Sequence, residues 1–148
     1  MIYLDGSSLT IDQVVEIARN KAEVGLSEEA KKNIQISRDI VEKNIEEKKV
    51  IYGLNTGFGK FVNVAISENE LDKLQLNLIL SDAVGVGDPF KQDVTRAIML
   101  LRVNALAKGF SGIRLSTVET MIAMLNKGVH PVIPEKGSVG SSGDLCPL

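Results

Sequence analysis

Apolar residues recur every three or four positions through most of the chain, which is the spacing of helices with one buried face. A first helix is predicted from Thr10, which forms a capping box with Gln13, to Gly25, which would end it. A second helix is predicted from Ser27 to about Lys48. Its apolar stripe consists of Ala30, Ile34, Val41 and Ile45, and charged residues fill the opposite face.

Two longer apolar segments predict further helices. Residues 67–83 form one of them, and Ser67 with Glu70 makes a second capping box at its start. Residues 88–109 form the other, with Pro89 at the first helical position. This second segment carries apolar residues on several faces, so it belongs in the interior of something larger.

The ends of the chain follow other patterns. Residues 1–10 predict a short β-hairpin that turns at Asp5-Gly6. Residues 116–128 predict a last helix, capped by Ser116 with Glu119 and ended by Gly128. Pro131 and Pro134 then fix an extended approach to a loop rich in glycine and serine. The chain is therefore expected to be mainly α.

Composition narrows the class of protein. The 148 residues are 44% hydrophobic and 24% charged, with a net charge of −2, as in ordinary soluble domains. This balance argues against partners such as nucleic acid or a membrane surface, and no apolar run is long enough to span a bilayer. The N-terminus lacks a signal-peptide pattern, and the one cysteine, Cys146, is expected to be a packing residue. We therefore expect a cytoplasmic protein.

The loop at residues 137–145 (GSVGSSGDL) carries candidate chemistry. In a crowded turn, the Gly143 amide nitrogen can attack the Ser141 carbonyl carbon, and loss of water closes a five-membered ring. A second dehydration converts Ser142 into a methylidene group. The product is a methylidene-imidazolone, an electrophile made only of protein. The same loop could instead be an anion-binding nest or a plain flexible turn.

Four segments together resemble the aromatic amino acid ammonia-lyase family, which includes histidine and phenylalanine ammonia-lyases. They are residues 52–59 (YGLNTGFG), 74–87 (LQLNLILSDAVGVG), 131–136 (PVIPEK) and 137–147 (GSVGSSGDLCP). The resemblance runs in register from about Tyr52 to Leu148 and is nearest to the bacterial histidine ammonia-lyases. It favours the ring over the other interpretations of the loop.

The resemblance implies a fold and an assembly. Residues 1–148 would be the N-terminal portion of a larger chain, ending just after the electrophile-forming loop. The fold would be part of a long helical bundle with a short N-terminal hairpin and irregular active-site loops. Family members form homotetramers with active sites shared between chains, act on a small amino acid, and use the protein-derived ring with no external cofactor and no metal.

The resemblance also assigns roles to residues. Tyr52 would be the base that removes the substrate β-proton, and Ser141-Ser142-Gly143 would form the electrophile. Asp144 would support ring closure, a role compatible with capping a helix. Gly59 would lie against the substrate. His130 is the only histidine, and its position between Val129 and Pro131 favours a structural role.

Two positions depart from the family pattern. Ser141 replaces the usual alanine, but only its backbone enters the ring. Asp82 replaces the histidine that contacts the substrate imidazole, whereas its neighbour Ser81 matches. A buried carboxylate can accept an imidazole N–H but is costly beside a phenyl ring, so conversion of L-histidine to trans-urocanate is favoured. An aminomutase with the same electrophile, or a non-catalytic assembly module, remains an alternative.

Overall fold

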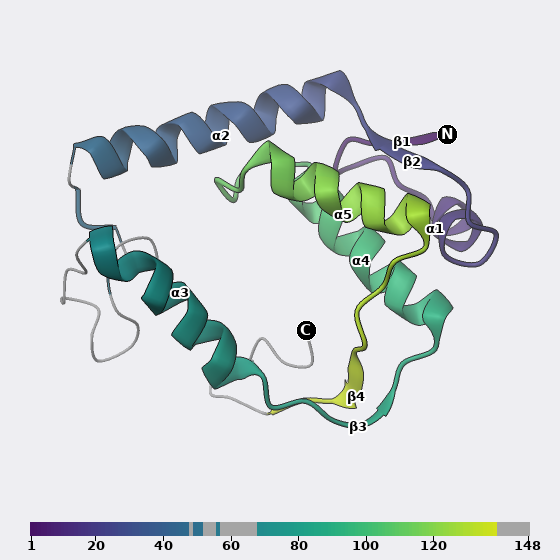
Figure 1. The fold of residues 1–148 in the computed structure, drawn as a ribbon. Coiled ribbons are helices and arrows are strands. Elements are labelled where there is room, and N and C mark those ends of the chain that lie inside the picture. Colours follow the sequence, from purple (N-terminus) through teal and green to yellow (C-terminus); the bar gives the residue numbers. More distant parts are fainter. Residues whose placement is uncertain (48, 52–55, 57–67, 139–148) are drawn as a thin grey trace. The chain divides into compact units, whose positions relative to one another are not determined.

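The computed structural model describes residues 1–47, 49–51, 56 and 68–138 (Figure 1). The chain divides into two compact units. The first unit comprises residues 1–42 and 90–132, and the second comprises residues 43–89 and 133–148.

The first unit contains most of the regular structure. In chain order its elements are β1 (Ile2–Leu4), α1 (Ile11–Ala18), β2 (Val24–Leu26), most of α2 (Glu28–Glu46), α4 (Gln92–Leu106) and α5 (Leu115–Lys127). Helices α1 and α5 both pack against α4. The buried cluster comprises Leu4, Ile17, Val24, Leu26, Ala30, Ile34, Met99, Leu100, Val103, Leu106, Ala107, Val118, Ile122 and Leu125. The prediction of a mainly helical chain is confirmed.

The predicted N-terminal hairpin is wrong. Strand β1 pairs in parallel with β2, so that Ile2 lies opposite Val24 and Leu4 opposite Leu26. Asp5 and Gly6 do form a turn, in which the Asp5 carboxylate accepts hydrogen bonds from two following backbone amides. The turn sends the chain into α1 instead of back along β1, because the partner strand comes only after that helix.

The start of α1 is as predicted, but its end is not. Thr10 Oγ1 accepts a hydrogen bond from the Gln13 amide, and Gln13 Oε1 accepts one from the Thr10 amide, which completes the capping box. The helix ends at Ala18, well before Gly25, which lies within β2. Lys21 takes a left-handed conformation with φ of 58°, and this turn redirects the chain toward the strand.

Helix α2 follows its predicted course. The Ser27 hydroxyl accepts a hydrogen bond from the Ala30 amide, and the helix runs to Glu46. Ala30 and Ile34 are buried, whereas Val41 and Ile45 are partly buried, so the predicted stripe faces inward most strongly at the start of the helix.

The end of α5 was predicted correctly and its start was not. Gly128 ends the helix in a left-handed conformation with φ of 71°. The N-cap is Arg114, which makes no side-chain capping bond, so Ser116 lies inside the helix and the predicted capping box is wrong.

Helix α4 starts later than predicted. Asp88 and Pro89 belong to strand β3 (Val86–Pro89), which pairs antiparallel with β4 (Pro134–Lys136), and the helix begins only at Gln92. Pro89 is the last residue of β3, a position at which a strand tolerates proline. Within α4, one face is buried by the first unit, while Leu101 on the opposite side is exposed.

The second unit contains α3 (Glu68–Asp82) together with β3 and β4. The helix matches the predicted range 67–83 closely, although Ser67 of its predicted capping box lies outside the described residues. Leu76, Ile79 and Leu80 of α3 are exposed. Thr56 is fully buried.

Candidate active site

The predicted site residues all belong to the second unit by their position in the chain. Most of them lie outside the residues that the structure describes, namely Tyr52, Gly59, Ser141, Ser142, Gly143 and Asp144. The two that it describes are Ser81 and Asp82.

Ser81 and Asp82 form the C-terminal end of α3. Ser81 is exposed and its hydroxyl lies 3.5 Å from Asp82 Oδ1, the far limit of a hydrogen bond. The Asp82 side chain is partly buried, and its backbone carbonyl accepts a hydrogen bond from the Val84 amide at 2.9 Å. The chain therefore turns directly after Asp82, toward β3.

The β3–β4 ladder relates Asp82 to the proposed ring loop. Val86 pairs with Lys136 in an antiparallel register. Residues that precede Val86 and residues that follow Lys136 therefore leave the ladder at the same end. Asp82 precedes Val86 by only a few residues, and Ser141 follows Lys136 by only a few. The ladder thus brings the chain on which Asp82 lies next to the chain that enters the loop.

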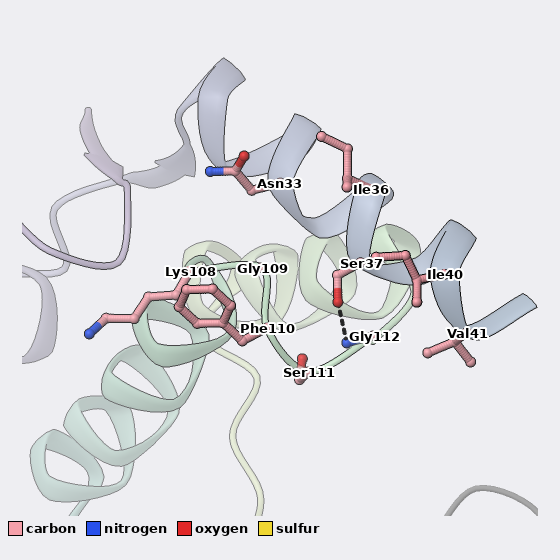
Figure 2. Close-up of a pocket in the computed structure, with 10 residues that line it drawn as sticks. All are labelled: Asn33, Ile36, Ser37, Ile40, Val41, Lys108, Gly109, Phe110, Ser111 and Gly112. Carbon is pink, nitrogen blue, oxygen red and sulfur yellow. Dashed lines mark hydrogen bonds between the residues drawn. The ribbon is translucent and has the colours of Figure 1, made fainter. Parts of the chain in front are cut away.

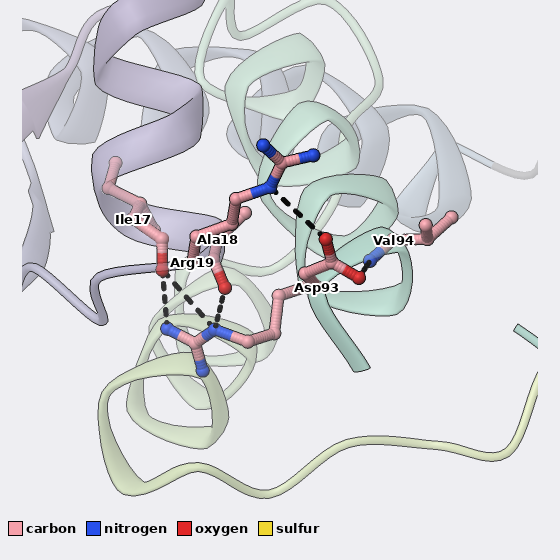
Figure 3. Close-up of polar contacts among 6 residues, drawn as sticks. Ile17, Ala18, Arg19, Asp93 and Val94 are labelled. Atoms are coloured by element: carbon pink, nitrogen blue, oxygen red, sulfur yellow. Dashed lines mark hydrogen bonds and ion pairs between the residues drawn. The ribbon is translucent and has the colours of Figure 1, made fainter. Parts of the chain in front are cut away.

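A buried arginine that the sequence pattern did not single out organises the first unit. The Arg96 side chain is 2% exposed and lies on the same face of α4 as Met99 and Val103. Its guanidinium donates to the carbonyls of Ile17 and Ala18 at the end of α1, at 2.8–3.2 Å (Figure 3). The signal in the sequence was a charged residue within an otherwise apolar stripe.

The same guanidinium reaches the end of α5 and His130. Arg96 Nη1 donates to the Leu125 carbonyl at 2.7 Å and lies 3.2 Å from His130 Nε2. Because helix ends leave carbonyls without partners, a cation that bonds two helix C-termini stabilises both. Burial lowers the pKa of Arg96, but an arginine still keeps its charge in such a site.

His130 is neutral in this arrangement. An arginine can only donate, so Nε2 must accept and the ring proton must reside on Nδ1. The Gln92 amide lies 3.2 Å from Nδ1, and its oxygen can accept this proton once the amide is turned over. The pKa of His130 is lowered, first by burial and then by the charges of Arg96 and Lys21. Its contacts support the predicted structural role.

A cleft of about 570 Å³ lies elsewhere in the first unit, between α2 and the loop at residues 108–112 (Figure 2). The Gly112 amide donates to Ser37 Oγ at 2.8 Å and ties this loop to the helix. Ile36, Ile40 and Phe110 line the cleft and are exposed, Phe110 by 89%. The described residues that line it all belong to the first unit.

The described part of the chain offers neither a metal site nor a membrane-spanning helix. Among those residues, no group of three or more histidine, cysteine, aspartate or glutamate side chains could hold a metal ion. No helix there is both long enough and apolar enough to cross a membrane.

Comparison with known proteins identifies the family. A family model for aromatic amino acid lyases matches residues 9–148, which is nearly the whole chain. The chain belongs to the aromatic amino acid lyase family. The resemblance of its motifs to this family is thereby confirmed.

Individual members of the family agree with this assignment. Histidine ammonia-lyase of Caldanaerobacter subterraneus is 60% identical over 147 residues, which cover 99% of this chain and 29% of the relative. The structure of histidine ammonia-lyase from Trypanosoma cruzi matches with a TM-score of 0.86 and 41% identity, over 94% of this chain and 27% of the other. Tyrosine aminomutase from Streptomyces globisporus matches with a TM-score of 0.87 and 38% identity, over 93% and 26%.

The chain spans about 29% of the length of the curated relatives that it matches. Its fold corresponds to the N-terminal part of the ammonia-lyase fold, as predicted.

Proposed function

We propose that the full-length protein eliminates ammonia from L-histidine to give trans-urocanate. The observation that carries this proposal is the 58–60% identity to histidine ammonia-lyases along essentially the whole chain. The motif YGLNTGFG at residues 52–59 and the loop at residues 137–147 lie within the matched region.

The tripeptide Ser141-Ser142-Gly143 contains every atom that the electrophile needs. Attack of the Gly143 nitrogen on the Ser141 carbonyl carbon, followed by loss of two waters, gives the ring and its methylidene group. Ser141 keeps its hydroxyl outside the ring. When formed, the ring supplies an electrophile that makes the substrate amine a better leaving group. Asp144 would support this closure.

Proton removal and substrate placement would depend on Tyr52 and Gly59. Tyr52 would remove the substrate β-proton, which requires stabilisation of its phenolate because the ordinary tyrosine pKa is about 10. Gly59 has no side chain and would let the substrate approach the backbone closely. The ammonia then leaves as the double bond forms.

Asp82 would select the substrate. Its side chain is partly buried, and it lies a few residues before Val86, which pairs with Lys136 in the β3–β4 ladder. An imidazole N–H can donate to this carboxylate, whereas a phenyl ring leaves it without that bond. Ser81, at the end of the same helix, would border the substrate from the neighbouring position.

The direct test is a product assay on the purified full-length protein. Histidine should yield urocanate and ammonia in equal amounts, and phenylalanine should yield little cinnamate. Consumption of neither aromatic substrate, together with turnover of a cationic aliphatic amino acid, would contradict the histidine assignment and leave the lyase chemistry standing.

An aminomutase is the second candidate, favoured by the structural match to tyrosine aminomutase. A mutase would return the ammonia to the β-carbon. The same assay separates the two, because a mutase would accumulate a β-amino acid instead of free ammonia.

For the assembly, we propose a cytoplasmic homotetramer with active sites shared between chains. This proposal rests on the resemblance to the family. Sedimentation of the full-length protein would test the number of chains, and mixing of Tyr52 and Ser142 variants would show whether two chains complete one site.

A further inference from the structure

Exposed apolar side chains surround the cleft between α2 and the loop at residues 108–112 (Figure 2). Ile36 and Ile40 are 59% and 58% exposed and lie about one helical turn apart on α2, and Phe110 of the loop is 89% exposed. Of the described residues that line the cleft, only Lys108 is charged. Single exposed apolar side chains are ordinary, but a group of them around one cleft indicates a surface that another apolar group covers.

The backbone of the loop fixes the place of Phe110. Gly109 and Gly112 both take left-handed conformations, with φ of 75° and 66°. A Cβ on Gly109 would lie 2.5 Å from the Asn33 carbonyl carbon, so the loop packs against α2 more closely than other residue types would allow. The Gly112 amide also donates to Ser37 Oγ at 2.8 Å. Phe110 is therefore carried on a preorganised loop, and covering it costs little ordering of the backbone.

The size of the cleft favours an occupant from the same polypeptide. Ten residues line it, whereas a stable interface between separate proteins uses about 20–30 residues on each side. A segment of the same polypeptide needs less area, because its attachment holds it at an effective concentration of the order of mM. In the curated relatives such segments exist, since this chain matches their N-terminal part and spans about 29% of their length.

We propose that, in the full-length protein, an apolar segment of the same polypeptide that follows residue 148 packs over Phe110, Ile36 and Ile40. Phe110 is the anchor, because an aromatic side chain buries a large apolar area and this one is already held in place by its loop. The docking surface is independent of the proposed reaction, since no residue assigned to the reaction belongs to it.

A photoreactive phenylalanine analogue, p-benzoylphenylalanine, at position 110 of the full-length protein tests the occupant directly. Irradiation of the folded protein should cross-link position 110 to a peptide beyond residue 148, and the product should run at the mass of one chain on a denaturing gel. The control is the same analogue at position 3, where Tyr3 is 60% exposed on β1, and it should not yield that peptide. A product at twice the mass, a cross-link confined to residues 1–148, or no cross-link at position 110 would overturn the proposal.

Thermal unfolding of the full-length protein measures the burial of Phe110 without the analogue. Phe110→Ala should lower the melting temperature by more than about 3 °C, because truncation of a covered phenylalanine leaves a cavity. Phe110→Leu keeps most of the apolar contact and should recover at least half of that loss. If Phe110 stays exposed in the full-length protein, both variants should melt within about 1 °C of wild type, and that result would refute the proposal.

Discussion

The two units of the chain differ in what they contain. Every residue of the buried apolar cluster belongs to the first unit, whereas all eight predicted site residues belong to the second. The first unit is stabilised by its buried apolar cluster and by the hydrogen bonds from Arg96 to the ends of α1 and α5. The second unit contains helix α3, whose Leu76, Ile79 and Leu80 are exposed. Stability and chemistry are therefore expected to respond to different substitutions.

The sharpest test of this division is the proposed base. Tyr52→Phe should lower turnover by about 10²–10⁴-fold, the usual contribution of a positioned acid–base group, and leave the melting temperature unchanged. Steady-state kinetics and thermal unfolding of the same preparation would measure both. The matched control is Tyr3→Phe, at the other tyrosine of the chain, which is exposed in β1. A loss below about tenfold in Tyr52→Phe would move the base role elsewhere.

The converse test lies in α4. Leu100 is fully buried and its neighbour Leu101 is 51% exposed, so the pair differs in burial but not in residue type. Leu100→Ala should lower the free energy of unfolding by about 2–5 kcal/mol, because it removes buried methyl groups and leaves a cavity. Leu101→Ala should change it by no more than about 0.5 kcal/mol in the 148-residue chain. Urea unfolding would show this, and equal costs would contradict the burial pattern.

A third test sharpens the role of the second unit in substrate choice. Asp82→Leu should lower kcat/KM for histidine by roughly 10–100-fold relative to phenylalanine, because a hydrogen bond to a charged group contributes about 1.5–3 kcal/mol. Competition between the two substrates would measure the ratio. Asp88→Leu, at an exposed aspartate of β3, is the control in the same unit. An unchanged preference would mean that Asp82 points away from the substrate.

The smallest expected effect is a pH dependence of the first unit. The pKa of His130 lies below its ordinary value of 6.5, through burial and then the charges of Arg96 and Lys21. The His130 imidazole therefore binds a proton more weakly in the folded chain than in the unfolded chain. The contribution to stability is fully present above pH 6.5 and declines as pH falls below it.

Thermal unfolding between about pH 8 and pH 5 spans the ordinary histidine pKa and would measure this decline. His130→Gln should lose it, and Lys21→Gln should reduce it by removing one of the two cations. A decline in His130→Gln as steep as in wild type would assign it to other groups.

Local signals in the sequence predicted much of the helical structure. Capping chemistry acts over a few residues, so the Thr10–Gln13 box, the Ser27 cap and the Gly128 stop were visible in the sequence. The hairpin prediction failed because strand partners are chosen by tertiary packing, and β2 lies beyond a helix. Pro89 misled for a similar reason, since proline is common both at helix starts and at strand ends.

In the candidate site, too, local motifs were visible in the sequence and long-range contacts were not. The motifs around Tyr52 and Ser142 were visible in the sequence, because each consists of particular residues in consecutive positions. The hydrogen bonds of Arg96 could not be predicted from the sequence. Their acceptors are the backbone carbonyls of Ile17, Ala18 and Leu125, and every residue type has such a carbonyl. The β3–β4 register, which relates Asp82 to the loop, likewise depends on pairing across a long stretch of chain.

The most direct measurement of the central claim is the intact mass of the active full-length protein. If Ser141-Ser142-Gly143 forms the ring, the mass should be lower than the sequence mass by two waters. Ser142→Ala should have its full sequence mass, lose the near-ultraviolet absorbance and lose nearly all activity. An unmodified peptide spanning residues 141–143, recovered quantitatively from active enzyme, would contradict the account.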